Sequence, residues 1–433
     1  MHLFSKVLLL QSILFSFSDS HGQQKLESLP FTDSVSLRLD STEALFLRGN
    51  FLLLAQLYNV DAARAQVIQA RLYPNPAFNF GSTIYNQDAK KVWPAPFSSR
   101  GEVNSGLSQL IILAGKRNKQ VELARANVLL NQYQFFDLVR TLKYTLRTDF
   151  FNIFYLQQSA KVYDAEIKAL SQIVNAFAEQ GKKGYISEKE IIRIKAQLYS
   201  FKSEYNDLLN QIKDTESELR QVLQLKPTSY IIPVADTQAI RDWDPLKYQL
   251  TVLVDTAFRR RTDLIITRQN TAISELNYKY QKALAVPDVI ANLSYDQQGS
   301  YVKNLTMAGI SINLPFFNRN QGNIKAAKYG IDAATTTQKS VEHSVEENVY
   351  RALQKALDQD KLFKGIDTSF SADFERLMTE VLMQYQKRNI TILEFLDFYD
   401  SYKQNALQVN NIQFNRVSAF EDINFFTAYN FFN

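Results

Sequence analysis

The chain carries the same arrangement of motifs twice, about 200 residues apart, and this repetition limits what it can fold into. Gly106-Leu107-Ser108 recurs as Gly309-Ile310-Ser311, an offset of 203 residues. Ile186-Ser187-x-x-Glu190 recurs as Ile390-Thr391-x-x-Glu394, an offset of 204 residues. Two unrelated landmarks therefore keep nearly one register. A unit this long is not a solenoid repeat, so the chain is predicted to be a duplicated half-molecule.

The first residues are typical of a secretory signal peptide. Lys6 is followed by an apolar run over 7–17 and by small residues that fit cleavage after Gly22. The run is too short to span a bilayer, and the alternative is a frayed N-terminal helix. We therefore expect residues 1–22 to be removed. The chain has no Cys, so neither an acylated lipoprotein anchor nor a disulfide is expected.

A long helical rod is predicted in each half. From Lys116 to Gln180 there is no Gly or Pro, and apolar residues recur at an average spacing of 3.5 residues. Such a heptad repeat, or seam, of apolar residues predicts that the helix packs against a helical partner. The segment would extend roughly 100 Å as a helix. A Gly-rich turn at 181–184 and the capping motif Ser187-x-x-Glu190 then open a return helix. We expect helical hairpins over about 116–225 and, in the second half, about 321–427.

Four segments alternate apolar and small polar residues, which is the pattern of β-strands. They cover about 77–85, 102–112, 289–295 and 305–314, and Gln109 on the apolar parity leaves the end of the second one open. Each is at most about as long as a tilted transmembrane strand. The parity expected to face lipid holds Phe78, Phe80, Ile84, Ala308, Ile310 and Ile312.

The resulting plan is mainly α with a small β part, and each half reads helix, strand, strand, long helical hairpin. Leading helices are expected over 42–73 and 250–284. The predicted organisation is a signal peptide 1–22, a first repeat 23–225, a connector 226–249 in an equatorial region, and a second repeat 250–433.

Membrane entry is possible for this chain only through closed β-structure, because it contains no 18-residue apolar run after the signal peptide. Four strands cannot close a barrel, since the smallest known ones have about eight. Strands must therefore be pooled between copies, two copies giving eight strands and three giving twelve. The strand pattern alone leaves both possibilities open.

The sequence resembles the TolC-type outer-membrane efflux channels. The likeness rests on the duplicated plan, on Asn75-Pro76 before the first strand and on the paired tip motifs. Leu107-Ser108-Gln109 leading to Gly115-Lys116-Arg117, and the segment 314–323, are similar to the branch of cobalt–zinc–cadmium and copper efflux channels.

This resemblance implies a homotrimer with a twelve-stranded barrel in the outer membrane, in contact with its lipid, and a periplasmic α-helical tunnel. It also implies a passive exit duct for metal cations or small toxic compounds. Such a duct docks with a periplasmic adaptor (membrane fusion) protein and an inner-membrane, proton-driven RND-type pump.

At the hairpin tip, the resemblance implies an aperture ringed by carboxylates. Glu394 and Asp397 match the family's acidic positions, while Thr391-x-x-Glu394 also explains Glu394 as a helix cap. Tyr385 and Glu190 match positions that latch neighbouring hairpins in the family. The latch arginine corresponds to Ile390 here, with Arg388 two residues away, so a tyrosine in the helix seam is the alternative for Tyr385.

An enzyme is not expected, and neither is a cofactor or a bound metal. After the signal peptide the chain keeps only His343, and it has no phosphate-binding Gly-rich loop and no Gly-x-Ser-x-Gly motif. The formal net charge of +5 comes from a mixed balance that does not indicate a nucleic-acid partner. The remaining alternative is a periplasmic coiled-coil adaptor or structural spacer without a barrel, which would lack strands near 77–85 and 306–314.

Overall fold

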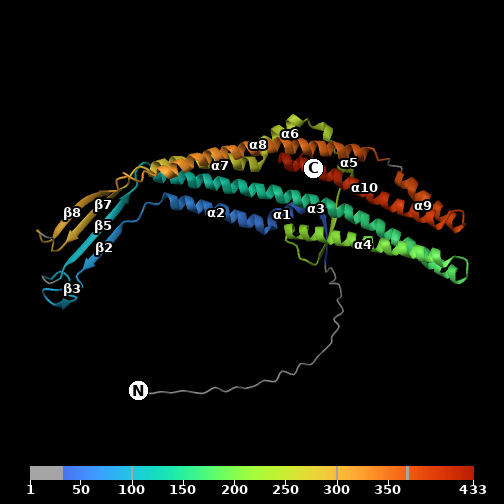
Figure 1. The fold of residues 1–433 in the computed structure, drawn as a ribbon, viewed down its shortest axis with the longest axis horizontal. Helices are drawn as coiled ribbons and strands as arrows, with labels where there is room; N and C mark the ends of the chain where they lie inside the picture. Colours follow the sequence, from blue (N-terminus) through green and yellow to red (C-terminus); the bar gives the residue numbers. More distant parts are fainter. Residues whose placement is uncertain (1–32, 99–100, 299–300, 367–369) are drawn as a thin grey trace, which may run out of the picture.

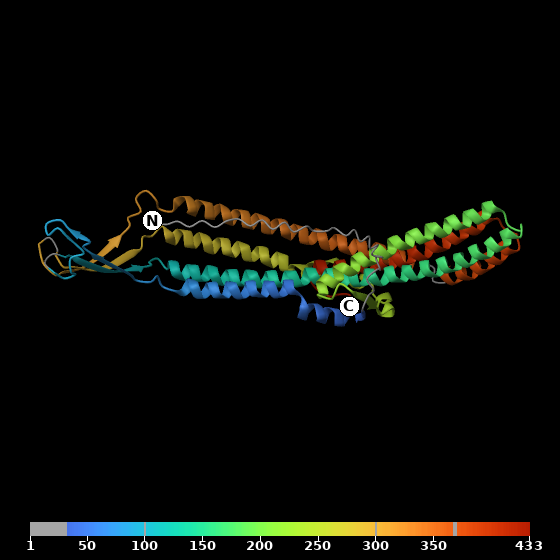
Figure 2. The same cartoon turned by 90° about the horizontal axis from the view of Figure 1, so that it is seen from below.

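The computed structural model describes residues 33–98, 101–298, 301–366 and 370–433, so the expected signal peptide lies outside the described residues. The molecule is long and narrow, with a β-sheet at one end and helices along its length (Figure 1). At the other end two short turns connect α-helices into hairpins (Figures 1 and 2). It is mainly α-helical with a small β part, as the sequence predicts.

The two halves follow the same order of elements. In the first half these are α1 (Leu39–Gly49), α2 (Phe51–Arg71), β2 (Ala77–Ser82), β5 (Val103–Ile111), α3 (Lys116–Lys182) and α4 (Glu188–Leu223). The second half has α6 (Leu250–Arg260), α7 (Thr262–Leu284), β7 (Val289–Asp296), β8 (Leu305–Ile312), α8 (Gln321–Lys364), α9 (Phe370–Gln386) and α10 (Ile392–Thr427). The loop after β2 adds a short hairpin of β3 (Tyr85–Asn86) and β4 (Lys91–Val92).

Each leading helix is interrupted once, which corrects the expectation of single helices over 42–73 and 250–284. The breaks fall at Asn50 and Arg261, both with an extended backbone. The Asn50 side chain accepts hydrogen bonds from the first turn of α2 and donates one to the Val222 carbonyl of α4 at 2.8 Å. Asn50 is therefore both the N-cap of α2 and a link to the return helix.

A parallel strand pair closes the middle of the molecule, and the sequence gives no sign of it. β1 (Asp33–Arg38) lies beside β6 (Ser229–Val234) in the connector, which continues with α5 (Thr237–Arg241) and a 3₁₀ turn at Pro245–Lys247. The paired residues are almost 200 positions apart in the sequence, so no local pattern could predict the pairing.

The predicted heptad seam is confirmed as the buried face of α3. One core in the middle of the molecule surrounds Phe150 and Ile153, and a second, around Leu253 and Phe420, packs against it through Trp243. A third core near the turns joins both hairpins through Leu170, Val174, Phe177, Ile194, Phe201, Tyr385 and Phe395. The hairpins of the two halves are thus packed together along their length.

The strands of the two halves form one antiparallel sheet in the order β2-β5-β7-β8. β2 and β8 are its edges, and their outer hydrogen-bonding groups have no strand partner among the described residues. The connections between the four strands and the helices all lie at the same end of the sheet (Figure 1).

Candidate functional site

One face of the sheet is apolar across all four strands. Directly paired residues point to the same side of a sheet. Phe78 pairs with Leu107, which continues to Leu293 and Ala308, and Ile312 stands opposite Val289. The side chains of Phe78, Phe80 and Ile310 are 70%, 59% and 74% exposed in the single chain. The structure thus brings the predicted lipid-facing residues of both halves onto one exposed surface, except Ile84.

Ile84 does not belong to a strand. β2 ends at Ser82, and Ile84 lies in the bend before the β3–β4 hairpin, with its side chain exposed. The expected strand over 77–85 is therefore too long. Its alternation beyond Ser82 comes from the hairpin, in which Trp93 N–H donates to the Ile84 carbonyl.

Gln109 lies on the apolar face, and its amide is satisfied by backbone. Its Nε2 donates to the carbonyls of Pro74 at 3.0 Å and Leu110 at 2.9 Å. The strand therefore continues past it to Ile111. A polar group on an apolar face costs little when it is hydrogen-bonded in this way.

The opposite face of the sheet carries amides, hydroxyls and glycines. Asn79 pairs with Gly106, and Gly81 pairs with Asn104. A Cβ at Gly106 would lie 2.5 Å from the Asn79 amide oxygen, and one at Gly81 would lie 2.4 Å from that of Asn104. A larger residue at either position would have to displace the asparagine side chain that covers it.

The return helices α4 and α10 both begin with the predicted capping boxes. Glu190 accepts from the Ser187 N–H and hydroxyl at 3.0 and 2.7 Å, and Glu394 accepts from the same groups of Thr391 at 2.7 and 2.9 Å. These hydrogen bonds hold the pKa of both carboxyl groups below the usual value. Glu394 has a capping role in the single chain.

Asp397 lies on the same face of α10 as Glu394, three residues further on, and its side chain is exposed. It lines a groove with Arg193 of α4 and with Asp400 and the buried Lys403 of α10. No hydrogen bond to Asp397 is described, so its carboxylate is available to a neighbouring chain or to an ion.

Tyr385 and Glu190 lie at one cavity of about 650 Å³ between the turns, together with Arg388. Tyr385 is buried, and its ring stacks on Phe395 at 5.0 Å. Burial and then the Glu190 charge raise its pKa to about 12. The Arg388 guanidinium donates to the Tyr185 carbonyl across the turns. Within one chain Tyr385 is thus a seam residue, and Arg388 links the two hairpins.

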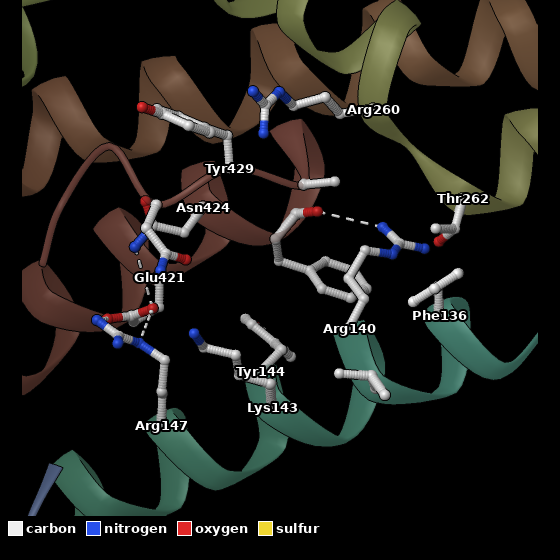
Figure 3. Close-up of a pocket in the computed structure, with 14 residues that line it drawn as sticks. Phe136, Arg140, Lys143, Tyr144, Arg147, Arg260, Thr262, Glu421, Asn424 and Tyr429 are labelled. Atoms are coloured by element: carbon white, nitrogen blue, oxygen red, sulfur yellow. Dashed lines mark hydrogen bonds and ion pairs between the residues drawn. The ribbon is translucent and has the colours of Figure 1, made fainter. Parts of the chain in front are cut away.

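A buried ionic cluster near the middle of the molecule has no counterpart among the predicted site residues. A cavity of about 220 Å³ lies where α3, α10 and the α6–α7 break meet, and Figure 3 shows the residues that line it. Beside it, Arg147 donates to both carboxylate oxygens of Glu421 at 2.7 Å and to Glu43 at 2.7 Å. Burial would lower the pKa of Arg147, but the two carboxylates outweigh it and keep the pKa above the usual value.

The cluster could not be found from sequence because Arg147 and Glu421 are 274 positions apart. It joins α1, α3 and α10, and hence the two halves of the chain. Among the described residues, no group of three His, Asp or Glu side chains is arranged to hold a metal ion.

Asp149, two residues after Arg147 in α3, is a buried carboxylate that makes the stability of the fold depend on pH. One of its oxygens has no hydrogen-bond partner, and burial and the Glu218 charge raise its pKa to about 7. The folded chain therefore holds a proton that the unfolded chain releases from about pH 4 upward, so stability falls as pH rises from about 4 to about 7. We expect Asp149→Asn to flatten this fall and to be more stable than the wild type at about pH 8.

Thermal unfolding of both proteins across this pH range checks the prediction. The exposed Asp358→Asn variant is the control and should follow the wild type. Equal pH dependence in wild type and Asp149→Asn would show that this carboxyl group ionises normally.

Comparisons with known proteins agree with the architecture. Residues 45–224 match the model of the outer membrane efflux protein family. The cobalt-zinc-cadmium resistance protein CzcC of Cupriavidus metallidurans is 21% identical over 360 residues, which are 81% of this chain and 82% of that protein.

Two solved structures show the same fold. The CmeC outer membrane channel of Campylobacter jejuni superposes with a TM-score of 0.71 at 15% identity, over 98% of this chain and 94% of that one. CusC superposes with a TM-score of 0.69 at 15% identity, over 92% and 95% of the two chains.

The duplicated helices and strands and the shared sheet are the architecture of the solved outer membrane channels, and residues 45–224 match the outer membrane efflux protein model. The chain thus has the fold of the outer membrane channels CmeC and CusC. The similarity to a cobalt-zinc-cadmium resistance protein agrees with the branch that the sequence motifs resemble. Among the described residues, no helix is long and apolar enough to cross a membrane.

Proposed function

We propose that three copies of this chain pool their sheets into a twelve-stranded barrel. The observation that carries this proposal is the four-stranded sheet with one apolar face and two unpaired edges. Open sheet edges are not tolerated in lipid. Because neighbouring strands alternate in direction from β2 to β8, β8 of one copy can pair antiparallel with β2 of the next, and closure leaves no edge.

The helices continue this barrel as a tunnel through the periplasm. Support comes from the exposed apolar side chains of α2, which a neighbouring copy would cover. They include Phe51, Leu52, Tyr58 and Ile68, each more than half exposed. An apolar surface this extensive on one chain marks a protein interface.

In this arrangement the protein is the passive outer-membrane duct of a tripartite efflux system. A periplasmic adaptor and an inner-membrane RND-type pump would deliver the cargo, and the likeness to CzcC and CusC supports metal cations or small toxic compounds as that cargo. A duct needs no tight metal site, since a conduction pathway must release what it admits.

A periplasmic spacer without a barrel is the competing function, and membrane fractionation separates the two. The duct must be recovered in the outer-membrane fraction and must raise the conductance of planar bilayers. Recovery of the full chain in the soluble periplasmic fraction, with no conductance, would favour the spacer.

We further propose that Asp397, with Glu394 behind it, lines the periplasmic aperture, where three copies would bring six carboxylates together. Glu190 and Tyr385, at the cavity that also holds Arg388, would close the contact between neighbouring hairpins. A ring of carboxylates favours cations in a narrow pore. The exposure of Asp397 supports this role, and the capping hydrogen bonds place Glu394 second to it.

Removal of these charges should lower the cation preference of the channel. Glu394→Gln keeps the capping box, because glutamine also serves at this position, and Asp397→Asn removes the second charge. We expect the double variant to shift the reversal potential in a salt gradient toward that of a non-selective pore. Glu188→Gln, exposed at the other turn, is the matched control. Unchanged reversal potentials would mean that Glu394 only caps its helix and Asp397 is only solvated.

A further inference from the structure

A band of basic side chains surrounds the end of the sheet that joins the helices. Four segments make up this basic collar, namely residues 71–73, 113–119, 279–288 and 313–328. They contain nine Lys or Arg residues and a single acidic residue, Asp288. The collar thus has a net charge of +8, whereas the whole chain has +5 and the remainder −3. The positive charge of this protein is concentrated at one level.

The four segments are linked by contacts, and the helix ends that carry them lie at the same level along the long axis in both views (Figures 1 and 2). The Arg117 guanidinium donates to the Arg71 carbonyl at 3.2 Å, which links α2 to α3. Lys116 pairs with Asp288 at 2.7 Å, and Asn320 donates to the Gln281 carbonyl at 2.8 Å. These contacts hold the collar at a fixed position along the long axis of the molecule.

Most of the basic groups in the collar are not neutralised within the chain. Asp288 forms its ion pair with Lys116. Burial raises the pKa of Asp288, but the interactions led by Lys116 outweigh burial and hold the pKa below the usual value. The other eight basic residues form no ion pair among the described residues. Those with exposed side chains are Arg71, Lys279, Lys282, Arg319, Lys325 and Lys328.

Exposed aromatic rings accompany these charges. Phe317 is 95% exposed, and Phe316 and Tyr73 are each 68% exposed. The Arg117 guanidinium stacks over the Tyr73 ring, 3.9 Å from its centre. Large exposed rings next to cations without an ion pair are typical of a surface that meets a membrane interface.

We propose that the basic collar binds the phosphate groups of anionic phospholipids in the leaflet that faces the helices. This inference rests on the proposed barrel, which sets the collar just below the lipid-facing strands. Phe316, Phe317 and Tyr73 enter the boundary between acyl chains and head groups, while the neighbouring cations reach the phosphates. Lys and Arg near an anionic leaflet are attracted to it, and the attraction fades within a Debye length.

The collar also fixes the depth of the barrel. The apolar face extends from Ile312 to Phe80 within the strands, so a charged ring at its helical end keeps the sheet from sliding outward. Several cations at one level act together, which gives a lipid preference stronger than any single residue would provide.

Lipid binding by the purified full chain tests this proposal. The protein in detergent is mixed with equal amounts of phosphatidylglycerol and phosphatidylcholine, and the bound lipids are counted by native mass spectrometry. We expect a preference for phosphatidylglycerol of about fivefold or more. The triple variant Arg319→Gln, Lys325→Gln, Lys328→Gln should lower this ratio toward one. The control Lys182→Gln, Lys183→Gln, Lys189→Gln removes the same charge at the far tip and should keep the preference.

Equal binding of the two lipids by the wild type would overturn the proposal, as would an unchanged ratio in the collar variant. A collar variant that keeps its lipid preference and changes the reversal potential would place these side chains in the lumen instead. Conductance in pure phosphatidylcholine bilayers tests the channel separately. If the protein conducts in these bilayers but does not prefer phosphatidylglycerol, the result contradicts the lipid-binding proposal and leaves the proposed channel function in place.

Discussion

Ile310→Arg should prevent stable insertion of the protein into the outer membrane. Ile310 lies on edge strand β8, opposite Ala291 and on the apolar face, with 74% of its side chain exposed in the single chain. A charge on the lipid side of such a barrel costs about 2–4 kcal/mol near the bilayer midplane. Three copies would carry this cost at once. The measurement is the amount of heat-resistant trimer in outer-membrane preparations, which we expect to be nearly abolished.

The neighbouring residue provides the matched control. Ser311 pairs with Ile290 and points to the opposite face of the same strand. Ser311→Arg adds the same charge one position away, on the side that faces the lumen of the proposed barrel, and should insert and assemble. Because side chains alternate along a strand, only the Ile310 variant should fail. Equal amounts of trimer from both variants would contradict the assignment of the two faces.

Arg147→Met should strongly destabilise the helical part. Arg147 is 2% exposed and Glu421 is 1% exposed, and they meet through two hydrogen bonds of 2.7 Å. Loss of one partner of a buried pair leaves an uncompensated charge, at a cost of about 3–5 kcal/mol. We expect a clearly lower midpoint of thermal unfolding, followed by helical circular dichroism.

Two further variants separate the ionic effect from packing. Arg147→Met combined with Glu421→Leu removes both buried charges, and Glu43 keeps Lys143 as its partner at 2.8 Å, so much of the stability should return. Lys182→Met breaks the solvent-exposed pair with Glu179 at the tip and should leave the midpoint unchanged. A double variant as unstable as Arg147→Met would show that packing around the arginine matters more than its charge.

Local patterns in the sequence predicted the local parts of this fold. The seam from Phe150 to Phe177 repeats every three or four residues, and both turns carry a Ser or Thr followed by Glu three positions later. Such features need only neighbouring residues, so they can be recognised without a structure. The strands were predicted for the same reason, with an error at Ile84 where a separate hairpin continues the alternation.

The features that were not predicted depend on distant partners. β1 gains its strand character from β6, and Arg147 becomes a buried residue only when α10 supplies Glu421. The break at Asn50 left a weak signal, because asparagine is a preferred N-cap, but its second bond to Val222 crosses 172 positions.

The candidate aperture was predicted in part. The spacing of Glu394 and Asp397 predicted their shared helix face, and the Thr391-x-x-Glu394 motif predicted the capping bonds that Glu394 forms. The role of these side chains between chains depends on the assembled trimer.

The central claim is that sheets from three chains close into one barrel, and electron cryo-microscopy of the purified full-length assembly tests it most directly. We predict a threefold particle in which twelve strands form a continuous wall, with β8 of each copy hydrogen-bonded to β2 of the next. Isolated chains with an open four-stranded sheet, or an assembly without threefold symmetry, would contradict it.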